Sequence, residues 1–321
     1  MRAFEAGFEA ASRGPVGDAT PRDAQDGSAG AASRHPVVAG LLDRLRTTLP
    51  VDSHPLATEG IRRCIDWQDT AHAAQYLDHL ERLHRAAPAA PAPLLAETAR
   101  HLALWMTYED TIRVAALKTR ASRFARVHGE VKAATDQVLA IDEYLHPRLE
   151  EIVETLPPAL GRWLERPGWP RRLVERFTRR GRVVTTSSLG GFLLLYAVAG
   201  LRRWRRASAR FMLESARIEA WMTMIEQLAA THPALALEVA QCQRLVKGYG
   251  DTHARGWKNF SMLMDLVARQ AATLAPATLR ELRDAALADE RGDALHAALL
   301  RHGLGHDRSP PAQPRPQPLA A

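Results

Sequence analysis

Cysteine is scarce in this chain of 321 residues. Cys64 and Cys242 are the only two, they lie far apart in the sequence, and no Cys-x-x-Cys pair occurs. Four-cysteine iron–sulfur ligation and a cysteine-based zinc site within this sequence are therefore excluded. Two isolated cysteines fit a reducing compartment, so we expect buried thiols and a cytoplasmic protein.

Familiar catalytic motifs are also missing. The sequence contains no G-x-x-x-x-G-K-[ST] or G-x-G-x-x-G phosphate loop, no H-E-x-x-H and no G-x-S-x-G. Among the 13 histidines, His302 and His306 have i, i+4 spacing, but glycines surround them and no carboxylate is placed to complete a metal site. We therefore expect no metal site in this chain and no turnover by the chain alone.

Long apolar runs are absent. The longest, from Leu189 to Leu201, is shorter than the about 20 residues that a membrane-spanning helix needs, and it contains glycines. We expect a buried core helix there and no membrane span. The first residues carry Glu5 and lack the apolar segment of a signal peptide.

Aromatic residues make up only 6% of the chain, whereas alanine, leucine and arginine are abundant. These three residues are strong helix formers. The composition therefore predicts an all-α, multi-helix domain with long amphipathic helices and at most one small two-stranded β element.

The basic residues are almost all arginine. Lys118, Lys132, Lys247 and Lys258 are the only lysines, and the formal net charge is +7. One interpretation is the bias of a GC-rich genome. The other is a basic face for an acidic partner, such as a nucleic acid, an anionic membrane or an acidic electron carrier.

Composition divides the chain into four parts. Residues 1–12, with Phe4 and Phe8 at i, i+4 spacing, predict a short helix that resembles the end of a preceding domain. Residues 13–36 lack periodicity and predict a flexible linker. A helical domain is expected over 37–307, followed by a disordered Pro-rich tail over 308–321.

Within the helical domain, apolar periodicity predicts helices over 56–69 and 71–85. The prolines between Ala87 and Pro93 end this pattern. A long helix is then expected from about Leu94 to Lys118. Tyr108-Glu-Asp110 falls inside it, and we expect Asp110 to pair with a basic residue or to cap a neighbouring element.

The centre of the chain is less regular. The runs 137–141 and 182–186 favour strands and can pair with each other. Ser187 or Ser188 offers an N-cap for a helix that reaches about Ala230. Further helices are expected from Pro233 to about Lys247 and from Asp251 through Ala268, with two short ones before the tail.

A polar, glycine-rich corner separates two of these helices. Its candidate binding residues are Lys247, Gly248, Tyr249, Gly250, Asp251, His253 and Arg255. In a structural interpretation, Gly248 ends one helix with a left-handed backbone and Asp251 or Thr252 caps the next. In a functional interpretation, the basic side chains surround free backbone N–H groups at a helix start and form an anion site.

Arginines cluster just before this corner. On a single helix, Arg202, Arg206 and Arg210 would share a face, and the full candidate interaction surface is Arg202, Arg203, Arg205, Arg206 and Arg210. The cluster fits either a solvated face opposite a buried Trp204 or a docking surface for acidic residues of another chain. A single tryptophan among the arginines is weak support for nucleic-acid binding, and we expect no nucleic-acid binding.

Five stretches, in this order, carry a family resemblance: Gly60–Asp69 with Tyr76–Asp78, Tyr108–Ala115 with Leu117–Arg120, Leu156–Leu160, Thr185–Leu194, and Leu245–Gly256. They resemble the helical C-terminal extension of the beta subunit of indolepyruvate ferredoxin oxidoreductases. A more diverged version forms the C-terminal end of the large fused 2-oxoacid oxidoreductases. The resemblance covers roughly residues 37 to 305, and Leu245–Gly256 is its most specific part.

The resemblance implies a place among enzymes that oxidatively decarboxylate arylpyruvates to aryl-acetyl-CoA and pass electrons to ferredoxin. Thiamine diphosphate and iron–sulfur clusters belong mainly to the alpha subunit of that family. We therefore expect this chain to bind no cofactor alone and to have the alpha subunit as partner, with ferredoxin or CoA as further candidates.

The family's beta subunit normally begins with a gamma-type catalytic domain, which has no counterpart in this sequence. The resemblance thus implies an accessory or structural domain or subunit, from a split protein or a stand-alone copy. The alternative is a stand-alone basic helical binding or docking module with no catalytic role.

Overall fold

The computed structural model describes residues 35–131, 140–145, 149–178, 182–248, 250–289 and 292–304. The chain divides into one unit over Met1–Ala39 and a second over Gly40–Ala321. All described residues except 35–39 belong to the second unit. The helix expected over 1–12, most of the linker expected over 13–36 and the tail expected over 308–321 lie outside the described residues.

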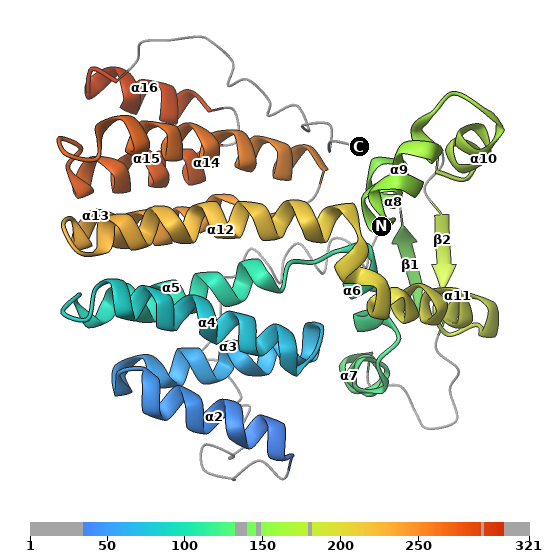
Figure 1. Ribbon diagram of the computed structural model, residues 1–321. Helices are drawn as coiled ribbons and strands as arrows, with labels where there is room; N and C mark the ends of the chain where they lie inside the picture. Colours follow the sequence, from blue (N-terminus) through green and yellow to red (C-terminus); the bar gives the residue numbers. More distant parts are fainter. Residues whose placement is uncertain are drawn as a thin grey trace. The chain divides into compact units, whose positions relative to one another are not determined.

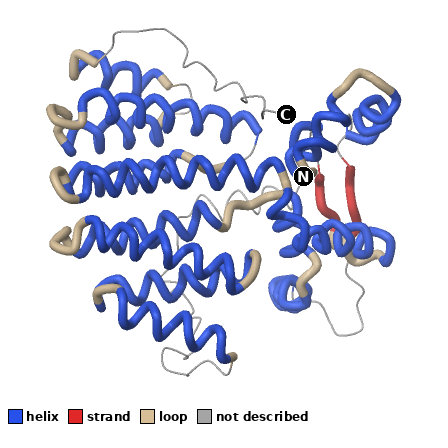
Figure 2. Tube along the Cα trace, viewed as in Figure 1, coloured by secondary structure: helices blue, strands red, loops and turns tan. Residues whose placement is uncertain are grey.

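The described residues form fifteen α-helices, three short 3₁₀ helices and one pair of strands, which confirms the all-α expectation (Figures 1 and 2). The N-terminal elements are α2 (Pro36–Thr48), η1 (Val51–Ser53), α3 (His54–Trp67), α4 (Thr70–Ala86) and α5 (Ala92–Met106). The C-terminal elements are α12 (Ala209–Ala229), α13 (Pro233–Gln241), η3 (Cys242–Leu245), α14 (Gly250–Gln270), α15 (Pro276–Ala288) and α16 (Asp293–Arg301).

These two groups of helices build the main core. α12 packs against α4, α5 and α13, so segments far apart in sequence lie side by side (Figure 1). Leu77, Leu102, Met222, Val239 and Leu263 are fully buried in the cluster. Their position on one face of each amphipathic helix explains the packing, because that face must leave water.

A middle segment connects α5 to α12. It contains α6 (Thr111–Lys118), α7 (Ala121–Val131), β1 (Asp142–Leu145), α8 (Leu149–Thr155), α9 (Pro158–Glu165), α10 (Trp169–Thr178), β2 (Arg182–Thr185), α11 (Leu189–Gly200) and η2 (Leu201–Ala207). None of its described side chains belongs to the main apolar cluster. The last buried cluster residue before the segment is Met106, and the next one after it is Ile218. The segment is therefore held by other contacts.

β1 and β2 pair antiparallel (Figure 1), from Asp142 opposite Thr185 to Leu145 opposite Arg182. The expected pairing of two strands is confirmed, but the first strand begins at Asp142 rather than within 137–141. Residues 137–139 lie outside the described part. Ile141, just before the strand, accepts a hydrogen bond from the N–H of Thr186 and donates its own N–H to Oγ of Ser187.

The expected helix from Leu94 to Lys118 is two helices. Thr107 ends α5, and its hydroxyl donates to the carbonyl oxygen of Ala103. Asp110 then starts α6, because its carboxylate accepts a hydrogen bond from the N–H of Arg113. The expectation that Asp110 caps or pairs is confirmed, although Asp110 lies at a helix start and not in mid-helix.

The expected helix from Ser188 to Ala230 is also interrupted. Ser188 caps α11 as expected, but η2 follows Gly200, and Ser208 caps a new helix by accepting from the N–H of Phe211. The expected buried core helix over 189–201 is wrong as well. Only Leu195 of α11 is buried, and most of its large apolar side chains are exposed.

Among the described residues, no helix is both long enough and apolar enough to cross a membrane.

Candidate functional site

Arg205 is the centre of a buried polar cluster. Its side chain is 1% exposed, and its Nε lies 2.7 Å from Oδ2 of Asp110, whose side chain is 7% exposed. The guanidinium also donates to the carbonyl oxygen of Trp67 and to Oε1 of Gln68, and it lies 4.0 Å from the centre of the Trp67 ring. A buried cation with these partners ties η2 to α3 and α6.

The five arginines that we expected on one surface therefore separate. Arg205 is internal, which corrects its assignment to an interaction surface. Arg202 points back to α3, donating to the carbonyl oxygens of Ile65 and Gln68, and Arg206 pairs with Asp69 at 2.7 Å. The arginines separate because η2 is a 3₁₀ helix. It has three residues per turn, so residues i and i+3 lie on the same side, whereas an α-helix has about 3.6 residues per turn.

Arg203 alone of the four arginines in η2 points outward without a carboxylate partner among the described residues. It stacks on Trp204, with its Cζ 4.4 Å from the ring centre. Trp204 is 57% exposed, which contradicts the expectation of a buried tryptophan opposite a solvated arginine face.

Arg210 joins three helices and the loop between α5 and α6 at a second cluster. Its guanidinium contacts Glu154 of α8 at 2.9 Å, Glu214 of α12 at 3.0 Å and Nε2 of His253 in α14 at 3.3 Å. It also lies 5.6 Å from the ring centre of Tyr108. Glu214 is 1% exposed and accepts a further hydrogen bond from the indole N–H of Trp105. Arg210 thus holds parts of the fold together. This geometry does not favour the expected role of Arg210 in an interaction surface.

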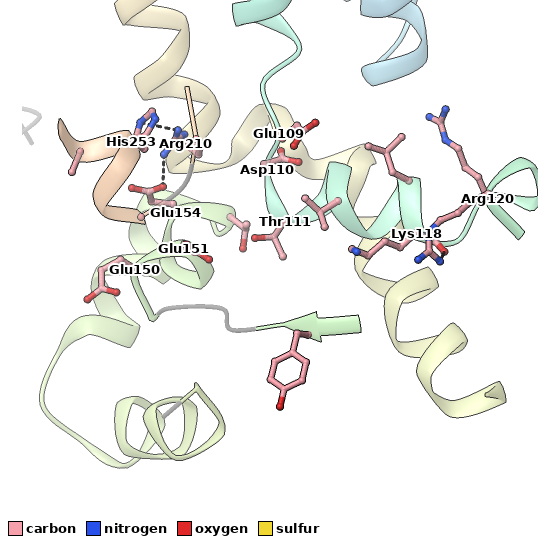
Figure 3. Close-up of a pocket in the computed structure, with 18 of the residues that line it drawn as sticks. Glu109, Asp110, Thr111, Lys118, Arg120, Glu150, Glu151, Glu154, Arg210 and His253 are labelled. Carbon is pink, nitrogen blue, oxygen red and sulfur yellow. Dashed lines mark hydrogen bonds and ion pairs between the residues drawn. The ribbon is translucent and has the colours of Figure 1, made fainter. Parts of the chain in front are cut away.

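A cavity of about 1320 Å³ opens beside Arg210 (Figure 3). Glu150, Glu151 and Glu154 on α8 lie toward one end, and Lys118 and Arg120 near the end of α6 lie toward the other (Figure 3). The remaining wall residues include Glu109, Asp110, Arg123, Arg126, Tyr144, Gly248, Gly250 and His253. The cavity thus has an acidic end and a basic end.

The charges at the basic end are only partly balanced. Lys118 and Arg123 share one carboxylate, that of Glu143 on β1. Arg113 and Arg120 share another, that of Asp66 on α3. Burial opposes ionisation of Asp66, but the two arginines outweigh it and keep the pKa of Asp66 below its ordinary value. In these pairings four cations share two carboxylates, which suits an anionic group at this end of the cavity.

His253 lies at the opposite wall as a neutral imidazole. Burial lowers its pKa, and the adjacent Arg210 guanidinium lowers it further. Since Arg210 donates to Nε2, the neutral ring carries its proton on Nδ1. The nearby Tyr108 hydroxyl is buried without a hydrogen-bond partner among the described residues, and burial raises the pKa of Tyr108.

The glycine corner lies at the edge of this cavity. Gly248 has φ +82°, which confirms its expected left-handed backbone, and Gly250, at φ +53°, begins α14. A Cβ at Gly256 would lie 2.2 Å from the carbonyl oxygen of Leu245, so only glycine allows α14 to pass so closely. These glycines support the structural interpretation of the corner.

The other residues expected at the corner divide between cavity and surface. Gly248, Gly250 and His253 line the cavity, whereas the side chain of Lys247 is exposed. Asp251 and Arg255 each take part in an interaction within the structure. Tyr249 lies outside the described residues.

Sequence reasoning missed the acidic half of the site. Glu154 and Glu214, which hold Arg210, were not singled out, and neither was the Glu143 that holds Lys118 and Arg123. The spacing of Glu150, Glu151 and Glu154 on one short helix was the signal available. Within the described ranges, no three His, Cys, Asp or Glu side chains are grouped as a metal ion would require.

A search of curated proteins and a search of solved structures each find no match. A family model matches residues 53–266, a range that includes α3 to η3, most of α14 and every cavity residue named above. The chain belongs to this family, which is described as a family of unknown function, DUF6537.

Proposed function

We propose that this chain is a helical accessory domain of an indolepyruvate-type 2-oxoacid ferredoxin oxidoreductase. In this proposal it binds the alpha subunit, which carries thiamine diphosphate and iron–sulfur clusters and oxidatively decarboxylates arylpyruvates. The proposal also places the chain in the cytoplasm, where its two cysteines stay reduced.

One observation carries the proposal. The separate stretches on which the family resemblance rests are joined to one another in the fold. Asp66, from the first stretch, pairs with Arg113 and Arg120 from the second. α11, from the fourth stretch, packs along α6 from the second. Such residues determine how the elements fit together, so a chain that shares them is expected to share the fold of the extension.

Charge supports a docking role. The chain is basic overall, and the cavity presents unbalanced cations near Lys118 and Arg120. An acidic protein such as ferredoxin, or a phosphate-bearing ligand such as CoA, has the complementary charge. The chain's two cysteines, both buried, do not fit an iron–sulfur cluster, so the proposal assigns cluster chemistry to the partner.

Co-purification tests the proposal. The chain is co-expressed with the alpha subunit of an indolepyruvate-type oxidoreductase encoded in the same genome, and complex formation is measured after affinity capture of one subunit. A stable complex is expected. No complex at any salt concentration, with both subunits folded, overturns the proposal and leaves the stand-alone docking module as the alternative.

The glycine corner has its own test. Lys247→Gln with Arg255→Gln is compared with Lys258→Gln with Arg269→Gln, which removes the same charge from exposed positions farther along α14. If the corner forms part of the interface, only the first pair weakens binding, and high salt has the same effect. Equal affinity of both double variants for the alpha subunit and for CoA assigns the corner a purely structural role.

Turnover provides a separate check. The purified chain, supplied with arylpyruvate, CoA, thiamine diphosphate and an electron acceptor, is expected to give background rates only. Turnover that persists after removal of all other subunits contradicts an accessory role.

A further inference from the structure

Helix α11 exposes an apolar face. It contains no charged residue, and four of its large side chains are more than half exposed: Leu189 at 76%, Leu193 at 53%, Leu194 at 55% and Tyr196 at 62%. The opposite side of α11 packs against the rest of the protein, since Leu195 is buried and α11 lies along α6. A soluble helix normally turns polar residues outward, so this face is unpartnered.

The exposed side chains form a continuous stripe. Leu189, Leu193 and Tyr196 have i, i+4, i+7 spacing, which places them on one side of the helix. Gly190 and Ala197, both exposed, lie between this row and Leu194. The small residues leave a shallow recess between two apolar ridges, a shape that accepts side chains of an opposing helix.

Exposed apolar side chains are also frequent elsewhere in the middle segment. More than half of the large apolar side chains that are exposed in the described residues lie between Tyr144 and Trp204. Over the same described stretch, only three apolar side chains are buried, those of Val153, Leu164 and Leu195. Tyr144 and Val183, directly opposite each other across the two strands, are 84% and 50% exposed. Exposed aromatic side chains such as Tyr144 and Tyr196 are a type that is enriched at protein interfaces.

A cation borders the stripe. Arg203 follows α11 by three residues and lies against the exposed ring of Trp204, with no carboxylate partner in the described part of the chain. No acidic residue occurs in α11 or η2, so a second copy of the same face offers Arg203 no counter-charge. A partner surface that is apolar and carries a carboxylate near Arg203 would therefore complement this face better than a second copy of the same face.

We propose that the α11 face, defined by Leu189, Leu193, Leu194 and Tyr196 with Arg203 at its end, docks an apolar ridge of the alpha subunit that carries a carboxylate opposite Arg203. This assignment rests on the proposed function, which supplies the identity of the partner. Tyr196 and Trp204 are the side-chain types that most often dominate binding energy at such surfaces.

The test measures binding of the purified alpha subunit to the intact chain by titration calorimetry. The main variant is Leu193→Asp with Tyr196→Asp, and a milder one is Leu189→Ser. Because all three side chains are exposed, both variants are expected to fold, which circular dichroism checks. Leu300→Asp on α16, at 57% exposure, is the matched control for adding a charge at an exposed apolar position.

We expect the double variant to bind at least about tenfold more weakly, with Leu189→Ser intermediate and Leu300→Asp unchanged. Arg203→Glu should weaken binding and reduce its salt dependence. If the wild-type chain binds and the α11 variants bind equally well, the docking assignment is wrong while the proposed function stands. If the wild-type chain does not bind, both fail.

Two other occupants are also distinguished. A wild-type dimer in analytical ultracentrifugation that becomes monomeric in the double variant assigns the face to a second copy. Binding of the wild type, but not the variant, to vesicles of phosphatidylcholine and phosphatidylserine assigns it to a membrane surface. Either result overturns the proposal.

Discussion

Asp110 and Arg205, which are 95 positions apart in sequence, form an ion pair whose two side chains are almost completely removed from solvent. The same Asp110 carboxylate caps α6, so one side chain fixes both a helix start and a long-range contact. Removing either partner leaves the other buried and unpaired, which costs far more than an exposed ion pair contributes.

Arg205→Met should therefore lower the free energy of unfolding by about 3–5 kcal/mol. Arg203→Met, two positions away on the same 3₁₀ helix but exposed, should change it by about 0.5 kcal/mol or less. Urea denaturation of both variants measures the difference. Similar values for the two would show that burial of the ion pair contributes little.

Two adjacent glycines at the start of α11 should respond oppositely to alanine. A Cβ at Gly191 would lie 2.2 Å from the carbonyl oxygen of Thr185, whereas a Cβ at Gly190 meets no atom within 4 Å. We expect Gly191→Ala to destabilise the protein by about 1–3 kcal/mol through strain, and Gly190→Ala to be neutral or stabilising by up to about 1 kcal/mol. Thermal unfolding of the two variants tests this, and a more stable Gly191→Ala would contradict the close approach of β2 to α11.

Stability should fall as the pH is lowered from about 7 to about 5.5. Burial lowers the pKa of His72, His79, His101 and His253, so the folded state favours neutral rings. Below the ordinary histidine pKa of about 6.5, the unfolded chain binds more protons than the folded one, and the free energy of unfolding decreases. The expected loss is about 1 kcal/mol or more, measured from urea midpoints.

A histidine variant isolates the cause of that loss. His101→Gln should show a smaller pH dependence, because its ring is 3% exposed and is hydrogen-bonded to Gln243. His232→Gln, at an exposed position, should keep the wild-type dependence. A midpoint that stays constant or rises on acidification would refute the assignment.

The two cysteines should be unreactive in the folded protein. Cys64 and Cys242 are 0% exposed, and burial raises the pKa of each thiol to about 12. Since the thiolate is the reactive species, a disulfide-exchange reagent at pH 8 should label neither residue until the protein is unfolded in denaturant. Rapid labelling of one equivalent without denaturant would place a cysteine at an accessible position.

Local signals predicted much of the fold. Prolines and small polar residues end and begin helices through backbone effects that act within a few positions, so Ser188 as a cap and Gly248 as a left-handed residue were both predicted correctly. The strand pair was predicted for the same reason, since β-branched residues mark its second member.

Long-range contacts account for what could not be predicted. The break after Thr107 depends on Asp110 meeting Arg205, and the burial of Arg205 depends on the Trp67 ring and backbone. Periodicity cannot reveal such partners, so η2 was mistaken for part of an α-helix. The cavity combines residues from α6, α8, α12 and α14, and of its local signatures only the glycine corner was recognised, while the three glutamates of α8 were not.

The position of the Arg205–Asp110 pair determines how far the middle segment can be separated from the rest of the fold. It joins the point where the chain leaves α5 to the point where it approaches α12, and these two helices are themselves in contact. The segment between them thus starts and finishes at the same place, like a domain inserted into an existing loop. Its removal would leave two helix ends that already lie close together, since Trp105 near the end of α5 donates a hydrogen bond to Glu214 near the start of α12, so a short turn can connect them. The helices on either side would then form a bundle without the segment that carries most of the exposed large apolar side chains.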